Sequence, residues 1–288
     1  MKLTGIETIQ FNSRHHNANR NWLLIKLLTD DPDVFGIGEA SPLGLDNQVD
    51  SILKWWFEHY LDGKDPLDSE VHWTRMHQGT VSRSGRLVAT AISGIDIALW
   101  DLRGKILGVP VYTLLGGAHK TRLRVYANGW YTTPAPPELI ADEAKIVMDK
   151  GYTALKFDPF GRDSYFNISR KELRLAEGRV AAVRATVGPD VDILVEAHAK
   201  FNVATAIQIG KRLEQYEPTF YEEPVSYELA AEMADVRNRV DIPIATGERL
   251  YHKYDFYELI EAHAVDFLQP DICNAGGITE LKKIAAIA

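Results

Sequence analysis

From residue 122 onward the chain repeats one pattern, in which short apolar segments alternate with longer segments of helical periodicity. Ser169 begins one of the helical segments as part of a capping box, and Asn202 is a suitable N-cap for another. Strands that alternate with helices form parallel βαβ units, and both an α/β barrel and a doubly wound sheet have this pattern. The six predicted strands are residues 123–128, 154–159, 191–198, 219–224, 242–248 and 265–271.

The first 121 residues lack this repeat and are typical of an α+β domain. The change of pattern predicts two domains, at residues 1–121 and 122–288. The elements predicted for the first domain are strands at 2–11 and 21–30, a polar loop at 12–20, and helices at 49–60, 68–79 and 82–108.

The second domain holds fewer units than a closed barrel needs. Residues 122–288 contain six βα units, whereas an eightfold barrel takes about 250 residues. The sequence also stops inside an amphipathic helical segment that begins at Thr279. We expect an incomplete barrel whose last units lie in a further C-terminal segment; a six-unit open sheet is the alternative.

Composition excludes several classes of protein. With 45% apolar and 25% charged residues the chain has the balance of a globular protein, and it has no apolar run of membrane-spanning length. The net charge is −8 with no basic block, which argues against nucleic-acid binding. Cys273 is the single cysteine, so no internal disulfide can form. We expect a cytoplasmic protein with a small-molecule partner and neither nucleic acid nor membrane as a partner.

Acidic residues stand at the carboxyl ends of four successive predicted strands; they are Glu196, Glu222, Glu248 and Asp271. In parallel α/β folds this end of the sheet carries the active site. The first three are each separated by 26 residues, about one βα unit. Carboxylates crowded together repel unless a cation neutralises them, and oxygen ligands favour Mg²⁺ over zinc.

Two further pairs of residues lie two positions apart on predicted strands. His198 follows Glu196 at this spacing, and Asp158 follows Lys156. Side chains two apart face the same side of a strand. A histidine and a lysine beside a metal–carboxylate centre indicate proton transfer next to a stabilised anion.

Motifs along nearly the whole chain resemble those of one family. They are AISGIDIALWDLRGK at 91–105, LLGG at 114–117, YEEP at 221–224, GERL at 247–250 and QPDICNAGGITE at 269–280. The sequence resembles the enolase superfamily, in its mandelate racemase/muconate lactonizing enzyme group. The resemblance implies an α+β capping domain and a modified (β/α)₇β barrel, here without its last units. It also implies Mg²⁺-dependent removal of the proton next to a substrate carboxylate, through an enediolate that the metal stabilises.

The resemblance assigns the metal ligands to Glu196, Glu222 and Glu248, where Glu196 replaces the aspartate of many members. The Lys-x-Lys motif of the second barrel strand is reduced here to Lys156 followed by Asp158, which counts against a lysine-based racemase or cycloisomerase. His198 is instead similar to the histidine of galactonate and mannonate dehydratase-like members.

The remaining site residues also come from the resemblance. Asp271 matches the aspartate of a His–Asp dyad whose histidine would lie beyond Ala288. The predicted loop at 12–20 would close over the substrate. The resemblance thus predicts that the catalytic residues are His198, Lys156 and Asp271. The substrate-binding residues that it predicts are Arg14, His15 and Asp158.

These assignments together predict a Mg²⁺-dependent dehydratase of an aldonate-type acid sugar. It would remove two groups from the substrate, the proton on the carbon next to the carboxylate and the hydroxyl group on C3. The product would be a 2-keto-3-deoxy acid. A racemase or epimerase of a hydroxy acid is one alternative, and a non-catalytic truncated barrel is another. Family members often form dimers and octamers, so we expect a homo-oligomer.

Overall fold

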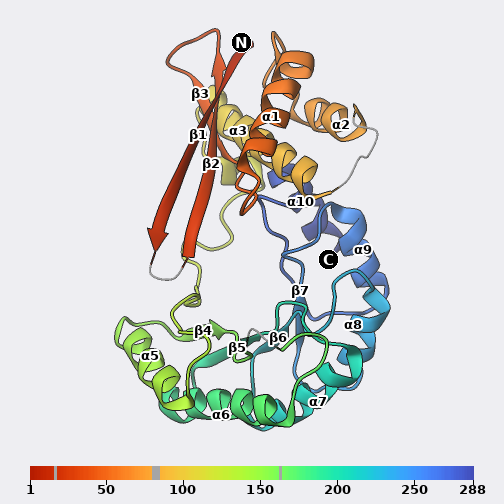
Figure 1. Ribbon diagram of the computed structural model, residues 1–288. Helices are drawn as coiled ribbons and strands as arrows, with labels where there is room; N and C mark the ends of the chain where they lie inside the picture. The colour runs from red at the N-terminus through yellow and green to blue at the C-terminus, as the bar shows by residue number, and fades with distance from the viewer. Residues whose placement is uncertain (16–17, 80–84, 162–163) are drawn as a thin grey trace. The chain divides into compact units, whose positions relative to one another are not determined.

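The computed structural model describes residues 1–15, 18–79, 85–161 and 164–288 (Figure 1). By internal contacts the chain divides into two compact units. Unit 1 comprises Met1–Thr121, Glu248–Tyr257 and Pro270–Ala288, and unit 2 comprises Arg122–Gly247 and Glu258–Gln269. One border between the units falls after Thr121, where the sequence predicts a domain boundary. Two segments beyond residue 247 group with unit 1, and the extent of the second domain stays a prediction.

Unit 1 contains a three-stranded antiparallel sheet of order β1-β2-β3. Its strands are β1 (Leu3–His15), β2 (Ala18–Thr29) and β3 (Phe35–Glu39). The predicted loop at 12–20 is wrong for most of its length, because strand pairing continues to His15 and Ala18. Polar residues on an extended hairpin have the composition of a loop, which explains the error. Strand β3 was not predicted from the sequence, and it is only five residues long.

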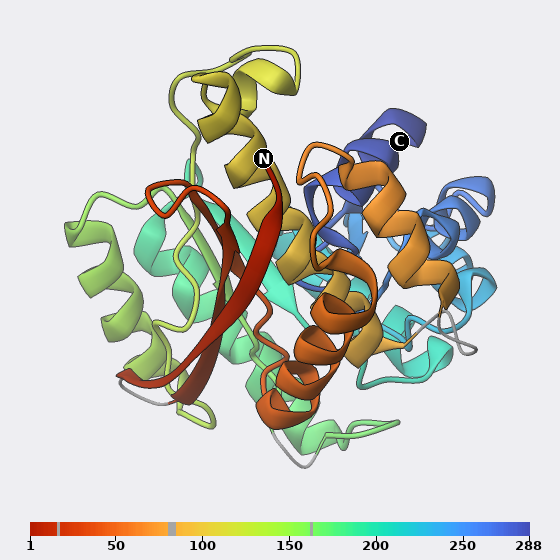
Figure 2. The same ribbon diagram turned by 90° about the horizontal axis from the view of Figure 1, so that it is seen from above.

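Helix α3 (Arg86–Leu107) packs against this sheet and is the central helix of unit 1. Figure 2 shows it in yellow beside the red hairpin and the orange α1. A Cβ on Gly38 of β3 would lie 2.1 Å from the carbonyl oxygen of Gly94 on α3, so sheet and helix backbones touch. Gly38 and Gly94 thus allow this close approach of sheet and helix. The other helices of the unit's N-terminal part are α1 (Asp46–Trp56), the π-helical η1 (Phe57–Leu61), α2 (Ser69–Gly79) and α4 (Val111–Leu114).

Helix α10 (Gly277–Ile287) begins against the buried polar face of α3. The Thr279 amide donates to Oδ2 of Asp96 at 2.9 Å, and the Gly276 amide donates to Oγ of Ser93 at 3.0 Å. Amides at a helix N-terminus have no intrahelical acceptor, so α3 supplies the caps. Burial raises the pKa of Asp96 to about 7, against the effect of its bonds to Thr279.

Unit 2 is built on a parallel sheet of order β4-β5-β6-β7-β8. The strands are β4 (Ala154–Phe157), β5 (Asp192–Glu196), β6 (Phe220–Glu222), β7 (Ile244–Thr246) and β8 (Phe267–Leu268). Five of the six predicted strands are therefore confirmed. The sixth, at 123–128, forms only a single parallel bridge, between Ala127 and Leu155. Consecutive parallel strands are the arrangement of an α/β barrel sheet.

Helices connect these strands, and those from α5 (Pro137–Asp149) to α8 (Ala230–Arg237) lie along one side of the sheet (Figure 1). Pro137 occupies the first turn of α5, where its missing amide hydrogen costs nothing. Ser169 accepts from the Glu172 amide at 3.1 Å, and Asn202 accepts from the Thr205 amide at 2.9 Å, which confirms both predicted N-caps. The helices are α5 (Pro137–Asp149), α6 (Arg170–Val187), α7 (Val203–Leu213), the 3₁₀ turn η2 (Glu214–Tyr216), α8 (Ala230–Arg237) and α9 (Lys253–Glu261). Among the described residues, none of the helices is both long and apolar enough to cross a bilayer.

Candidate active site

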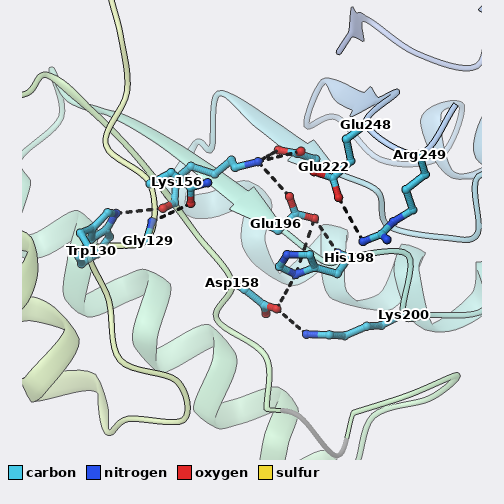
Figure 3. Close-up of polar contacts among 11 residues, drawn as sticks. Gly129, Trp130, Lys156, Asp158, Glu196, His198, Lys200, Glu222, Glu248 and Arg249 are labelled. Carbon is cyan, nitrogen blue, oxygen red and sulfur yellow. Dashed lines mark hydrogen bonds and ion pairs between the residues drawn. The ribbon is translucent and has the colours of Figure 1, made fainter. Parts of the chain in front are cut away.

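Three charged residues meet at the carboxyl ends of neighbouring strands in unit 2 (Figure 3). Lys156 lies on β4, and Glu196 and Glu222 are the last residues of β5 and β6. Glu196 and Glu222 are direct partners in the parallel register, which places their side chains on the same face. All three are buried. The predicted gathering of carboxylates at this end of the sheet is thus present for these two.

Lys156 binds both carboxylates. Its Nζ lies 2.8 and 2.7 Å from the two carboxylate oxygens of Glu222 and 3.1 Å from Oε2 of Glu196. Burial alone would lower the pKa of Lys156, but the charges of Glu196 and Glu222 outweigh it and raise that pKa. Burial and the charge of Glu196 raise the pKa of Glu222 to about 7, against the opposing effect of Lys156. The cluster is therefore one buried cation shared by two buried carboxyl groups.

His198 and Asp158 form a second group beside this cluster (Figure 3). Nδ1 of His198 lies 2.8 Å from Oδ2 of Asp158, and the ammonium of Lys200 donates to the same oxygen. The His198 backbone amide donates to Oε1 of Glu196 at 2.6 Å, so Glu196 joins the two groups. Burial lowers the pKa of His198, but the bond to Asp158 and the charge of Glu196 outweigh it and raise that pKa. The His198 side chain is 41% exposed, so this group is open to a ligand.

Lys200 belongs to this group although the sequence did not suggest it. It lies two positions beyond His198, which is the same spacing as in the pairs Lys156/Asp158 and Glu196/His198. The backbone between them is not a strand, however. His198 and Ala199 have φ angles of 52° and 56°, in the left-handed region. A turn of this kind cannot be recognised from residue types that do not favour it.

Within the described part of the chain, the other predicted site residues are not part of the Lys156–Glu196–Glu222 cluster. Glu248 follows β7 by two residues, belongs to unit 1 and pairs with Arg249 at 3.1 Å. Asp271, also in unit 1, accepts from the Cys273 amide at 2.8 Å and so holds its own turn. Arg14 and His15 end β1, and their side chains lie outside the described part of the chain.

Two of the three predicted metal ligands, Glu196 and Glu222, are placed where they could bind a hard cation. Glu196 and Glu222 offer buried oxygens that already converge on one positive atom, Nζ of Lys156, and such oxygens suit Mg²⁺. Within the described residues, no three His, Cys, Asp or Glu side chains are grouped so as to hold a metal ion. The predicted three-carboxylate metal site therefore stays a prediction.

Comparison with known families accounts for almost the whole chain. Residues 8–116 match the family described as mandelate racemase / muconate lactonizing enzyme, N-terminal domain. Residues 139–288 match the family described as enolase C-terminal domain-like. The chain belongs to the mandelate racemase/muconate lactonizing enzyme group of the enolase superfamily, which confirms the resemblance and the expected fold.

Similar proteins carry dehydratase names. The chain is 43% identical to a D-gluconate dehydratase of Thermoproteus tenax over 92% of its own length and 53% of that relative. It is 36% identical to a D-galactonate dehydratase of Ralstonia pickettii over 100% of the chain and 72% of the relative. The chain thus spans about half the length of the first of these relatives. A crystal structure of a putative dehydratase from Zymomonas mobilis superposes with a TM-score of 0.93 at 34% identity, covering 100% of this chain and 77% of that one.

Proposed function

We propose that the protein is a Mg²⁺-dependent dehydratase of an aldonate-type acid sugar, with gluconate and galactonate as the first candidates. The observation that carries this proposal is the arrangement around Glu196 at the carboxyl end of the sheet, where the backbone amide of His198 donates to Oε1 and the Lys156 ammonium donates to Oε2. The dehydratase names of the relatives support it.

Glu196, Glu222 and Glu248 would hold Mg²⁺, which supplies positive charge for the substrate carboxylate and for the negative charge that develops on it. Lys156 contributes a permanent cation at the same place. Its ammonium offsets the repulsion between Glu196 and Glu222 and keeps their oxygens together. We therefore assign Lys156 a role in organising the anionic centre.

The reaction removes the proton on C2 and the hydroxyl group on C3 as one water molecule. The enol that remains becomes a 2-keto-3-deoxy acid by moving one proton to C3. His198 is the exposed imidazole beside the carboxylate cluster and can carry a proton to or from the substrate. We assign it as the acid/base catalyst of this chain, and we keep Asp271 as the proposed aspartate of a His–Asp dyad.

Arg14 and His15 remain proposed substrate-binding residues because of the family resemblance, and they stand at the end of strand β1. We also propose that the protein is a homo-oligomer, because family members often form dimers and octamers. The single cysteine supports a location in the cytoplasm. A racemase or epimerase would need a second base, and the residue two positions after Lys156 is Asp158, not lysine.

Replacement of His198 by asparagine tests the proposal. Asparagine tolerates the left-handed backbone at this position, where φ is 52°. We expect His198→Asn to abolish formation of the 2-keto acid while Mg²⁺ binding, measured by calorimetry, is retained. His263→Asn is the matched control, because His263 is exposed and has a φ of 49°. Undiminished turnover in His198→Asn would remove His198 as a catalyst, and a racemised product would favour the epimerase alternative.

A further inference from the structure

The carboxylate of Asp158 is occupied by donors of the protein itself. Oδ1 accepts from the Phe160 amide at 2.8 Å. Oδ2 accepts from both His198 and Lys200. Asp158 is buried, whereas His198 is the exposed member of the group. The side chain of Asp158 is therefore placed to hold its neighbours rather than to bind a ligand.

The contact with Asp158 fixes which nitrogen of His198 carries hydrogen. A carboxylate accepts hydrogen bonds and cannot donate them, so the 2.8 Å contact requires a hydrogen on Nδ1 of His198. In the neutral ring the other nitrogen, Nε2, is then the unprotonated one. Lys200 is a donor only, so its contact with the same oxygen also uses Asp158 as the acceptor.

A strained turn brings the two donors to one oxygen. His198 and Ala199 both have left-handed φ angles, which cost about 1 kcal/mol or more each for residues with a Cβ. The turn is held by the Ala199 amide, which donates to the Glu223 carbonyl at 2.9 Å, and by the Lys200 amide, which donates to the Ala197 carbonyl at 3.2 Å. Strain of this kind persists where the surrounding contacts over-determine the backbone, and it collects at functional sites.

We infer that Asp158, with Lys200 as its counter-charge, is a positioning residue that holds His198 with hydrogen on Nδ1 and leaves Nε2 as the basic nitrogen offered to the substrate. The role of Nε2 in catalysis rests on the proposed function, whereas the orientation of the ring does not. This inference replaces the predicted substrate-binding role of Asp158.

Nitrogen-15 NMR of the histidine side chains tests the orientation directly. At alkaline pH, where the ring is neutral, the wild-type spectrum should show His198 protonated on Nδ1 and unprotonated on Nε2. The His198→Asn spectrum identifies the signal by its loss. In Asp158→Ala the preference for Nδ1 should disappear, whereas Asp190→Ala, which alters an exposed aspartate, should leave the signal unchanged. A wild-type ring protonated on Nε2, or an unchanged signal in Asp158→Ala, would overturn the inference. The wild-type spectrum decides this even where Asp158→Ala does not fold.

Kinetics separate positioning from substrate contact. Asp158→Ala should lower kcat about 100-fold or more, as loss of a histidine-orienting aspartate does in hydrolytic triads, with KM within about threefold of wild type. Lys200→Met should lower kcat by a smaller factor in the same direction. A raised KM with kcat retained would show that Asp158 binds substrate and would overturn the inference. A wild-type protein without dehydratase activity would defeat the proposed function instead, and the NMR result would still decide how His198 is held.

Discussion

Nζ of Lys156 lies within 2.8 Å of both carboxylate oxygens of Glu222, in a position where both side chains are buried. Burial of an ion pair is costly, and removal of one partner leaves the other charge without compensation. The charge of the buried carboxyl group of Glu222 is therefore balanced by a single lysine. Glu196 depends on the same ammonium, at 3.1 Å.

Lys156→Met should lower the free energy of unfolding by about 3–5 kcal/mol at neutral pH, since two buried carboxyl groups would lose their counter-charge. Chemical denaturation with urea measures this. Lys282→Met is the control, because Lys282 is exposed, and its effect should stay within about 0.5 kcal/mol. An equal, small loss in both variants would show that Lys156 does not organise the cluster.

Glu222→Gln should weaken Mg²⁺ binding and dehydratase turnover together. The amide keeps the size of the side chain but loses the charge and one acceptor oxygen. Titration of Mg²⁺ by calorimetry, beside a kinetic assay, measures both quantities. An unchanged metal titration would take Glu222 out of the proposed ligand set. Glu228→Gln, in the loop after β6, is the comparison variant.

The stability of unit 1 should fall in acid because of His252. This side chain is 4% exposed, and neither ring nitrogen has a hydrogen-bond partner among the described residues. Burial, with the nearby charge of His77, lowers the pKa of His252 from 6.5 to about 4. The unfolded chain then binds the proton more readily, so the stabilisation is present above pH 6.5 and is lost as the pH falls towards 4. The loss amounts to about 3 kcal/mol.

His252→Phe should remove this part of the acid dependence, because phenylalanine does not titrate. Urea denaturation at a series of pH values measures the slope. His263→Phe is the control, since His263 has a similar left-handed φ of 49° but is exposed. Equal slopes in His252→Phe and wild type would contradict the assignment.

Gly277→Ala should destabilise the protein more than Gly188→Ala. Both glycines have nearly the same φ, 79° and 78°. A Cβ at Gly277 would lie 2.5 Å from Oδ2 of Asp96, whereas a Cβ at Gly188 would meet nothing within 4 Å. The backbone cost of about 1–2 kcal/mol is common to both, so the difference in unfolding free energy reports the clash. Equal losses would mean that Asp96 moves away without cost.

The parallel sheet and its caps could be predicted because their signals are local. Ser169 and Asn202 cap their helices through contacts only three residues away. Glu196 and Glu222 end their strands in register, as their equal spacing predicts. The pattern of charges at strand ends therefore predicted that these two carboxylates meet.

Other features depend on contacts that a sequence does not display. The roles of Lys200 and Asp158 follow from a left-handed turn at residues that seldom adopt one. The extent of the β1–β2 hairpin was missed because polar residues there pair across strands. The apolar segment at 123–128 has the composition of a strand, yet only Ala127 is bridged to the sheet. In each case tertiary pairing, not residue type, determines the outcome.

The most direct test of the account is incubation of the purified protein with gluconate and with galactonate, with Mg²⁺ and with a chelator, while the 2-keto-3-deoxy acid is quantified by mass spectrometry. We predict formation of this product with Mg²⁺, its loss with the chelator, and its loss in His198→Asn. Absence of the product from a folded, Mg²⁺-loaded wild-type protein across a panel of acid sugars would contradict the proposed dehydratase.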